Sequence, residues 1–198
     1  IIHAHVNRGK RMESNIRNAL TVDVEDYFQV AAFSGQIDPR NWDQFTLRVE
    51  RNTQTLLGLF DEHDIKATFF VLGWTADRHR DLVRRIAAAG HEIACHSYAH
   101  PVVFELTPEQ FADDLDRALE VLASCGAQPR GYRAPSFTIT PPVHEYLHLL
   151  RERGFAYDCS LFPVNHPRYG QPDSPRDPFV LESESDEPFV VLPMPTWR

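Results

Sequence analysis

The sequence predicts an α/β fold with a mainly parallel sheet. From residue 19 onward, short apolar runs rich in β-branched and aromatic residues alternate with longer stretches of helical period. The chain has 198 residues, 42% hydrophobic and 24% charged, which is enough for one buried core. We therefore expect an unpatterned segment, 1–18, followed by a single domain, 19–198. The repeated strand–helix unit favours a barrel or an open α/β sheet, and in a barrel the chemistry belongs at the carboxyl ends of the strands.

Strands are expected where apolar runs are bounded by turn residues. A Pro-rich stretch, 166–178, is too polar and too broken for core secondary structure, and it predicts a long loop. Long ordered loops are often functional. The expected strands are 19–22, 67–72, 92–95, 131–133, 155–158 and 189–192.

Four helices are expected between these strands. The clearest signal is at 107–125, where Thr107 can cap the helix, Pro108 suits its first turn and Gln110 completes a capping box. Glycines at positions 90, 126 and 154 follow three of the helices and are natural C-terminal caps. The expected helices are 46–63, 81–89, 107–125 and 142–153.

Charge and cysteine content exclude several classes of protein. A net charge of -8 argues against a nucleic-acid partner, because binding to phosphates rests on clustered Lys and Arg. The odd, widely spaced Cys95, Cys125 and Cys159 predict buried free thiols, with no disulfide framework and no paired-Cys metal site. No stretch is long and apolar enough to span a bilayer or to serve as a secretory signal, so a cytoplasmic location is expected.

Polar residues follow the expected strands at three places. The first group contains Asp23, Glu25 and Asp26, the second contains His96 and His100, and the third is Arg133 in the stretch RAPSF. Three carboxylates within four residues repel one another unless a cation or an arginine offsets their charge. A metal would do so, and a solvated turn that caps a helix is the alternative.

His96 and His100 are four residues apart, so on one helical turn both imidazoles would face the same way. A carboxylate could then complete a three-ligand site with open positions for water, which is typical of catalytic metal centres. Two ordinary surface or core histidines are the alternative. The zinc-protease pattern HExxH fails by one residue, because its second histidine would fall at Cys95.

The stretches TVDVEDYF, CHSYAH and RAPSF resemble, in order and spacing, the motifs of NodB-type polysaccharide deacetylases, carbohydrate esterase family four. The resemblance covers residue 19 to the end. It is nearest to the subgroup linked to bacterial exopolysaccharide synthesis with exosortase (PEP-CTERM) systems, which shares DVEDYFQV and a proline-rich stretch like FPVNHPRYG. It implies a distorted (β/α) barrel and hydrolytic N-deacetylation of N-acetylhexosamine units in a polysaccharide or oligosaccharide.

Carried over by position, the resemblance implies that Asp23 is the catalytic base and that Arg133 holds and tunes it. His96 and His100 would bind a divalent metal, Zn²⁺ foremost, with Co²⁺, Mn²⁺ or Fe²⁺ as alternatives. Such a metal would polarise the acetamide carbonyl, and main-chain N–H groups near Ser136 would help to stabilise the oxyanion.

The sequence departs from the family pattern at the carboxylate ligand, where an adjacent pair of aspartates is replaced by Asp23-Val24-Glu25-Asp26. Strand alternation places Glu25 on the same side as Asp23. A tight turn after Glu25 would instead bring Asp26 inward, and we prefer Asp26 as the ligand.

A second departure concerns the general acid, which the family supplies from a late histidine in a Leu-x-x-x-His motif. No such motif follows Leu192, so the sequence predicts a chain truncated at its C-terminus, with the acid histidine beyond Arg198. His166 does not match that spacing but could line the groove. Further substrate contacts are expected from Ser136, Phe137 and Asp158, and from Phe162 or Tyr169 stacking on a sugar, with packing as the alternative for either aromatic ring.

Two other functions remain open. Relatives of this family open cyclic amides or ureides, some without a metal when a glutamate replaces the ligand aspartate, and Glu25 keeps this activity in view. A carbohydrate-binding scaffold with a vestigial site is the other alternative, supported by the missing late histidine.

Overall fold

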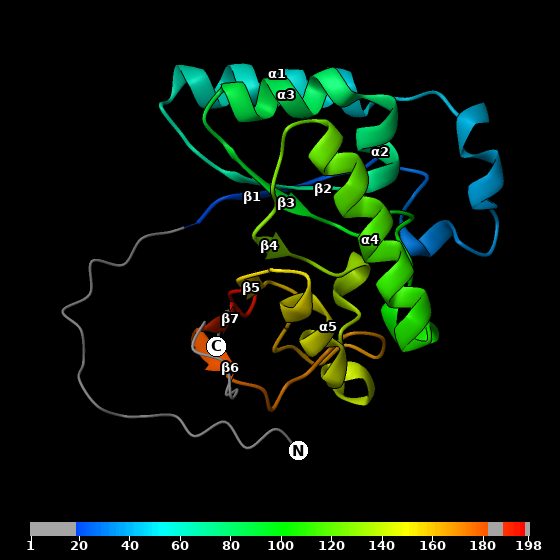
Figure 1. The fold of residues 1–198 in the computed structure, drawn as a ribbon, viewed down its shortest axis with the longest axis vertical. Helices are drawn as coiled ribbons and strands as arrows, with labels where there is room; N and C mark the ends of the chain where they lie inside the picture. The colour runs from blue at the N-terminus through cyan, green and yellow to red at the C-terminus, as the bar shows by residue number, and fades with distance from the viewer. Residues whose placement is uncertain (1–18, 182–187, 197–198) are drawn as a thin grey trace.

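A computed structural model describes residues 19–181 and 188–196 (Figure 1). The expected N-terminal segment, 1–18, lies outside the described residues. Within them the strands form one sheet in the order β1-β2-β3-β4-β5-β7-β6, with parallel neighbours except for the antiparallel pair β6 and β7. The mainly parallel α/β sheet predicted from the sequence is confirmed. Its strands are β1 (Thr21–Val24), β2 (Thr68–Val71), β3 (Glu92–Cys95), β4 (Gly131–Tyr132), β5 (Tyr157–Asp158), β6 (Phe179–Leu181) and β7 (Phe189–Val191).

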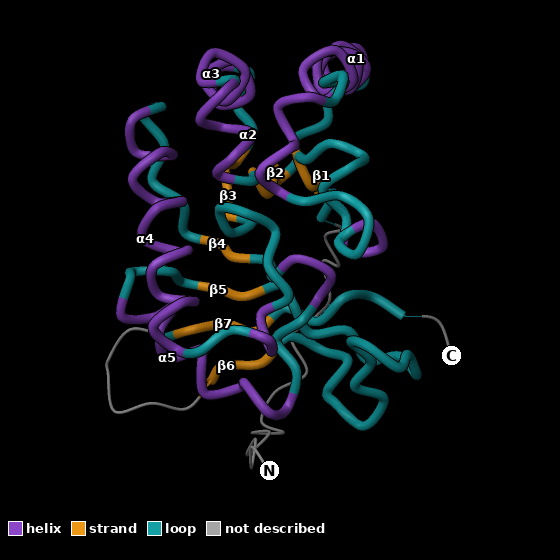
Figure 2. The backbone as a smooth tube through the Cα atoms, turned by 90° about the vertical axis from the view of Figure 1, so that its right-hand side faces the viewer, coloured by secondary structure: helices purple, strands orange, loops and turns teal. Residues whose placement is uncertain are grey.

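The longer helices lie on one side of the sheet, and the long loops lie on the opposite side (Figure 2). The capping box of α4 is present: Thr107 Oγ1 accepts from the Gln110 N–H at 3.3 Å, and Gln110 Oε1 accepts from the Thr107 N–H at 2.9 Å. The α-helices are α1 (Val49–Glu62), α2 (Gly73–Arg78), α3 (Arg80–Ala88), α4 (Pro108–Ser124) and α5 (Leu147–Glu152). Short 3₁₀ helices cover Ala31–Phe33, Pro39–Gln44, Val103–Glu105, Pro135–Phe137 and Pro141–Tyr146.

The structure corrects the predicted elements in four places. The first strand begins and ends two residues later than the expected 19–22. The helix expected at 142–153 is α only from Leu147, because Val143 leaves helical geometry with φ -125°. The sequence pattern did not predict α2 or β6. Helix α2 has six residues, which is too short for a periodic pattern. Strand β6 is a three-residue edge strand directly after the Pro-rich loop.

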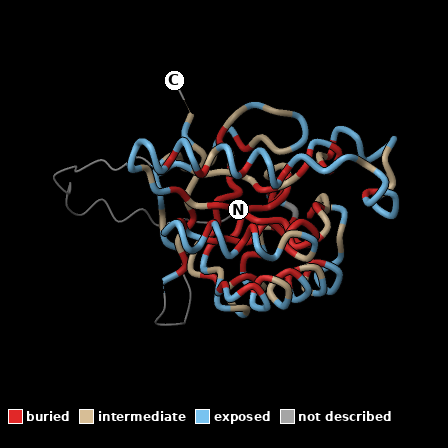
Figure 3. The backbone as a smooth tube through the Cα atoms, turned by 90° about the horizontal axis from the view of Figure 1, so that it is seen from above, coloured by how far each residue is buried: buried red, intermediate tan, exposed pale blue. Residues whose placement is uncertain are grey.

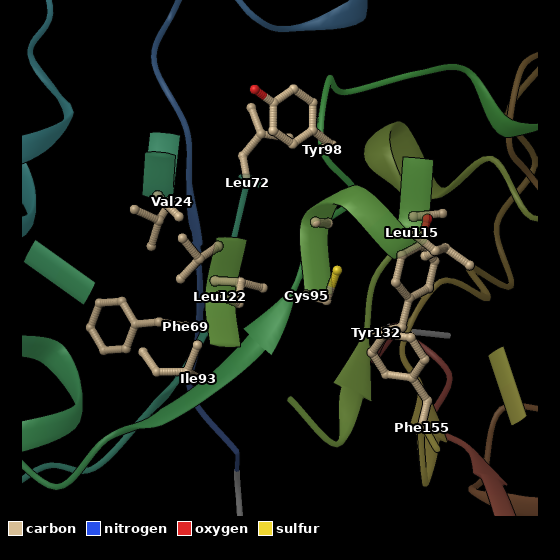
Figure 4. Packing of buried hydrophobic residues seen from close by; sticks show 14 of the residues in the cluster. Val24, Phe69, Leu72, Ile93, Cys95, Tyr98, Leu115, Leu122, Tyr132 and Phe155 are labelled. Carbon is tan, nitrogen blue, oxygen red and sulfur yellow. The ribbon is translucent and has the colours of Figure 1, made fainter. Parts of the chain in front are cut away.

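The core lies between the sheet and the helices. In β2, Phe69 and Val71 belong to the large cluster on the helix side, whereas Phe70 belongs to a smaller cluster on the opposite face with Ala94 and Cys159. This alternation follows from the two-residue period of a strand. Buried segments concentrate in the centre of the molecule (Figure 3), and Figure 4 places helix-side residues of the strands beside Leu115 and Leu122. Asp23 is in register with Phe70 and Ala94, so its side chain shares the face away from the helices.

The fold also places the cysteines and two tryptophans. Cys95, Cys125 and Cys159 are all buried free thiols, as expected. Trp42 and Trp74 belong to the buried core and pack against each other with ring centroids 5.4 Å apart. Within the described part of the chain, no helix has the length and hydropathy needed to cross a bilayer.

Candidate metal-binding active site

Asp23 and Arg133 form an ion pair at the carboxyl ends of β1 and β4. Arg133 Nη1 donates to Asp23 Oδ1 at 2.6 Å, and its Nη2 donates to Thr21 Oγ1 at 2.9 Å. The guanidinium also lies over the ring of Phe70, 4.1 Å from its centroid. The Arg133 side chain is only 4% exposed, whereas that of Asp23 is 29% exposed. A fixed cation therefore holds a carboxylate that is still open to solvent.

Burial lowers the pKa of Arg133, but the charge of Asp23 and further contacts outweigh it, so this pKa is raised. Arg133 is therefore a cation throughout the physiological pH range.

A second polar cluster lies next to this pair and joins residues from three parts of the chain. Glu25 Oε2 is 2.9 Å from His100 Nε2 and 3.8 Å from His96 Nε2. One ligand atom from each of the three residues lies within 4.8 Å of the others. Ligands placed tetrahedrally about Zn²⁺ at about 2.0–2.1 Å are roughly 3.3 Å apart, so the cluster has suitable dimensions for a divalent cation.

The hydrogen bonds of His96 leave its Nε2 free to act as a ligand. Its Nδ1 is 2.7 Å from the main-chain oxygen of Arg133, which only accepts, so Nδ1 must carry the proton. Metal-binding histidines are commonly oriented in this way by a bond from the other ring nitrogen. The buried Oε2 of Glu25 accepts no well-directed hydrogen bond from any residue that the structure describes, although His100 is close. A cation fits this unsatisfied oxygen.

The ionisation of the cluster also suits a cation. Burial lowers the pKa of His96 and outweighs the nearby carboxylates, so the imidazole is neutral at pH 7. Burial raises the pKa of Glu25, but the close approach of His100 and, to a lesser extent, of His96 more than offsets this, and the net shift is downward. Neutral imidazoles and an ionised carboxylate are the forms that bind metals.

The two histidines come together as expected, but the local geometry differs from the prediction. We call residues 96–100 the histidine loop; it follows β3 and contains no helical turn. Ser97 and His100 adopt left-handed conformations, with φ of 64° and 53°. The ring centroids of His96 and His100 are 5.5 Å apart.

The preference for Asp26 as the carboxylate ligand is contradicted by its position. Asp26 Oδ2 accepts from the Arg48 N–H at 2.7 Å and from the Val49 N–H at 3.0 Å, at the start of α1. It therefore caps a helix, where a negative charge is also favoured by the helix dipole. Glu25 directly follows β1, and its carboxylate lies 2.9 Å from His100.

Asp158 is not placed for the predicted substrate contact. It is 1% exposed, and both of its oxygens accept from Ser160: Oδ1 from the hydroxyl at 2.5 Å and Oδ2 from the N–H at 3.0 Å. Ser160 Oγ in turn accepts from the Ala134 N–H at 2.8 Å. Asp158 therefore supports the main chain at Ala134 through Ser160. Burial raises the pKa of the Asp158 carboxyl to about 6.

The other predicted substrate residues lie in or beside one aromatic cluster, in which each ring contacts another. His166 stacks on Tyr169 with centroids 3.7 Å apart, and Tyr169 stacks on Phe162 at 5.6 Å. Phe137 meets Phe162 at 5.1 Å and lies 5.8 Å from the Arg133 guanidinium, so it joins the cluster to the ion pair. These rings therefore stack on one another, which is the packing role given above as the alternative to binding a sugar. The adjacent Ser136, with φ 50°, is half-buried.

The chain is similar to known proteins in both sequence and fold. The family described as polysaccharide deacetylase matches residues 41–154. The chain belongs to the polysaccharide deacetylase family. It is 29% identical to a peptidoglycan deacetylase of Helicobacter pylori over 133 residues, 67% of this chain and 44% of that protein. It is 36% identical over 95 residues to the peptidoglycan-N-acetylglucosamine deacetylase of Bacillus cereus, covering 48% of this chain and 32% of that one.

Among solved structures, a Mycobacterium smegmatis protein assigned to the polysaccharide deacetylases superposes with a TM-score of 0.67 and 32% identity, covering 90% of this chain and 58% of that one. The fold predicted from the motifs is thus confirmed as that of the polysaccharide deacetylases. The chain spans less than half the length of the two curated relatives.

Some supporting residues had no recognisable signal in the sequence. Thr21 holds the Arg133 guanidinium, and Asp114, on α4, accepts hydrogen bonds from the histidine loop. Both are common polar residues in ordinary positions of a strand and a helix. Their roles depend on partners that are 112 and 16 residues away along the chain.

Proposed function

We propose that this protein is a metal-dependent deacetylase that hydrolyses the acetamide of N-acetylhexosamine units in a polysaccharide. The observation that carries this proposal is the convergence of Glu25, His96 and His100 beside the ion pair of Asp23 and Arg133. Membership of the polysaccharide deacetylase family and the similarity to bacterial peptidoglycan deacetylases support it.

A divalent cation, Zn²⁺ foremost, would be held by Glu25, His96 and His100. The chemistry that such a cation supplies is polarisation of the acetyl carbonyl and a lowered pKa of bound water. Three protein ligands leave coordination positions open, as catalytic sites require.

Asp23 is the proposed general base. Its partly exposed carboxylate takes a proton from water as the water oxygen adds to the acetyl carbon, while the bond from Arg133 holds the carboxylate in place. The carbon–nitrogen bond then breaks, and the leaving nitrogen takes up a proton from a general acid, the late histidine that the family pattern implies. The products are acetate and a free amine. Main-chain N–H groups near Ser136 are proposed to stabilise the oxyanion.

The finer substrate assignment follows from the motifs. The stretches DVEDYFQV and FPVNHPRYG support a bacterial exopolysaccharide precursor as substrate and the exosortase-associated subgroup as the nearest relatives. A net charge of -8 favours a neutral or partly deacetylated glycan over a polyanionic one.

The test combines metal analysis with an assay of acetate release from N-acetylglucosamine oligomers. We expect about one Zn²⁺ per chain after reconstitution, and loss of both metal and acetate release in a His96→Ala, His100→Ala double variant. A His63→Ala, His148→Ala double variant is the matched control, because it also removes two histidines but both are exposed and outside the cluster.

Each other outcome rejects a defined part of the proposal. Acetate release that survives chelation would reject the metal dependence. Opening of a cyclic ureide such as allantoin without acetate release would favour the ring-amide hydrolase. Glycan binding with neither metal nor turnover would favour the vestigial scaffold.

The identity of the carboxylate ligand has its own test. Glu25→Ala is expected to abolish tight metal binding, because it removes one of three ligands. Asp26→Ala is expected to keep the metal but to lower the free energy of unfolding by about 1–2 kcal/mol, since it removes the acceptor of two N–H groups at the start of α1. Metal titration and chemical denaturation of both variants measure this. The opposite pattern would make Asp26 the ligand.

A further inference from the structure

The histidine loop has a backbone conformation that needs external support. Its two left-handed residues, Ser97 and His100, both carry side chains. For a residue other than glycine such a conformation costs on the order of 1–3 kcal/mol and persists only where the surroundings enforce it. The orientation of His100 depends directly on its backbone, so whatever holds this loop also sets the geometry of the cluster.

Residues of α2 and α4 hold the histidine loop through hydrogen bonds. At the start of α2, the Gly73 N–H donates to the Ser97 oxygen at 2.8 Å and the Trp74 N–H donates to the Tyr98 oxygen at 2.9 Å. The fit is close, because a Cβ on Gly73 would lie 2.8 Å from a ring carbon of Tyr98 and 3.1 Å from the Ala118 Cα. The carbonyl groups of the loop are thereby fixed.

The N–H groups of the loop are held by a single side chain on α4. Asp114 Oδ2 accepts from the Tyr98 N–H at 2.8 Å, and Asp114 Oδ1 accepts from the Ala99 N–H at 3.2 Å. Burial raises the pKa of Asp114 in spite of these bonds. Burying an ionised carboxylate at this position is therefore unfavourable. Its two hydrogen bonds come from Tyr98 and Ala99, the residues directly before His100.

We propose that Asp114 is a positioning residue for the metal site: by accepting from two consecutive N–H groups, it holds the histidine loop in the conformation that aims His100 at Glu25. Asp114 touches neither substrate nor metal and acts through the main chain of the loop. The proposal rests on the proposed function for its metal, but its effect on the loop exists without one.

The chain offers a matched control on the same helix. Asp113 is the neighbouring residue, carries the same charge and is exposed. Asp114→Ala and Asp113→Ala therefore make the same change in net charge and in helix composition, and only the first removes the two bonds to the loop.

The first measurement is Zn²⁺ affinity, by competition with a chromophoric chelator, at a temperature where both variants are folded. Losing a supporting partner of a metal ligand weakens affinity about 10–100-fold, so we expect this loss for Asp114→Ala and parental affinity for Asp113→Ala. The absorption spectrum of the Co²⁺-loaded protein should also change only for Asp114→Ala. Equal affinities and spectra in the two variants would overturn the proposal.

If Asp114→Ala does not fold, Asp114→Asn takes its place. An amide keeps one oxygen acceptor but turns N–H donors toward the other loop amide, so an intermediate loss of affinity is expected. Parental affinity in a folded Asp114→Asn variant would contradict the positioning role.

The second measurement needs no metal and separates this proposal from the proposed function. Amide hydrogen exchange of Tyr98 and Ala99 in the metal-free protein is expected to be at least tenfold faster in the Asp114 variant than in Asp113→Ala. If the parent protein binds no metal but this difference is seen, the proposed function fails and the positioning of the loop stands. Unchanged exchange would refute the positioning.

Discussion

Two parts of the candidate site are held in place in different ways. One part comprises the polar residues at the ends of β1, β3 and β4, which we call the strand-end half, and the other is the loop at 161–178. At the ends of β1, β3 and β4, polar atoms are fixed by directed contacts such as the 2.6 Å bond from Arg133 to Asp23. In the loop, the rings of Phe162, His166 and Tyr169 contact one another with centroids 3.7–5.6 Å apart, and hydrogen bonds such as that from the Gln171 N–H to the Phe162 oxygen at 3.0 Å hold the main chain. Directed hydrogen bonds between charged groups fix atoms closely, whereas stacking tolerates small shifts. The side chains of the first half are therefore held in fixed positions, as the proposed catalysis requires, whereas the rings of the second half can shift against one another.

The largest effect should come from Asp23→Asn in the strand-end half. Removing a general base typically lowers turnover by about 10²–10⁴, and the amide keeps the shape of the side chain, so metal content should not change. Acetate release and metal analysis of the same preparation measure the two effects. Full activity would show that another group takes the proton.

The next largest effect is expected for Arg133→Ala. Without the 2.6 Å bond from Arg133, the Asp23 carboxylate loses its fixed orientation, so turnover should fall by up to about 10²-fold. The main-chain oxygen that orients His96 remains, so Zn²⁺ affinity should change much less than activity. Steady-state kinetics of acetate release and a Zn²⁺ titration test this pair of expectations. Unchanged turnover would refute the positioning of Asp23 by Arg133.

A smaller effect concerns Asp158 beneath the strand-end half. Its pKa is raised by burial from 3.8 to about 6, so the folded protein binds this proton more tightly than the unfolded chain. The ionised carboxyl therefore destabilises the fold above pH 6, and this cost is relieved as pH falls toward 4. Between pH 7 and pH 5 the parent should gain about 1–2 kcal/mol relative to Asp158→Asn. Denaturation of both proteins at the two pH values provides the measurement, and a constant difference would exclude the raised pKa.

The smallest effect is expected in the loop. Tyr169→Ala removes the central ring of the stack and should raise KM for N-acetylglucosamine oligomers about three- to tenfold with kcat nearly unchanged, because it alters binding and not the reacting atoms. Steady-state kinetics separates the two constants. A large fall in kcat would mean that the two halves are not distinct.

The sequence predicted what depends on local pattern and on strand ends. Alternating apolar runs located most strands and helices, and the carboxyl ends of parallel strands brought Asp23, His96 and Arg133 together as expected. The preference for Asp26 over Glu25 was wrong because the Asp26 carboxylate accepts from N–H groups at the start of α1, a contact 22 residues away along the chain that a local pattern does not show.

Tertiary contacts account for the features that the pattern could not predict. The spacing of His96 and His100 suggested a helical turn, yet the chain forms a loop, because α2 and Asp114 supply hydrogen bonds that an isolated segment lacks. The burial of Asp158 likewise follows from its bonds to Ser160 and not from its position after a strand.

Arg133 serves the site twice, with its guanidinium on Asp23 and its carbonyl oxygen on His96. This double use has a consequence for insertions and deletions. One residue added or removed at the end of β4 would turn the side chain to the opposite face of the sheet and displace the carbonyl in the same step. The loop at 161–178 has no such alternation to preserve. Length variation between relatives should therefore accumulate in that loop, while the spacing from β4 to Arg133 stays constant.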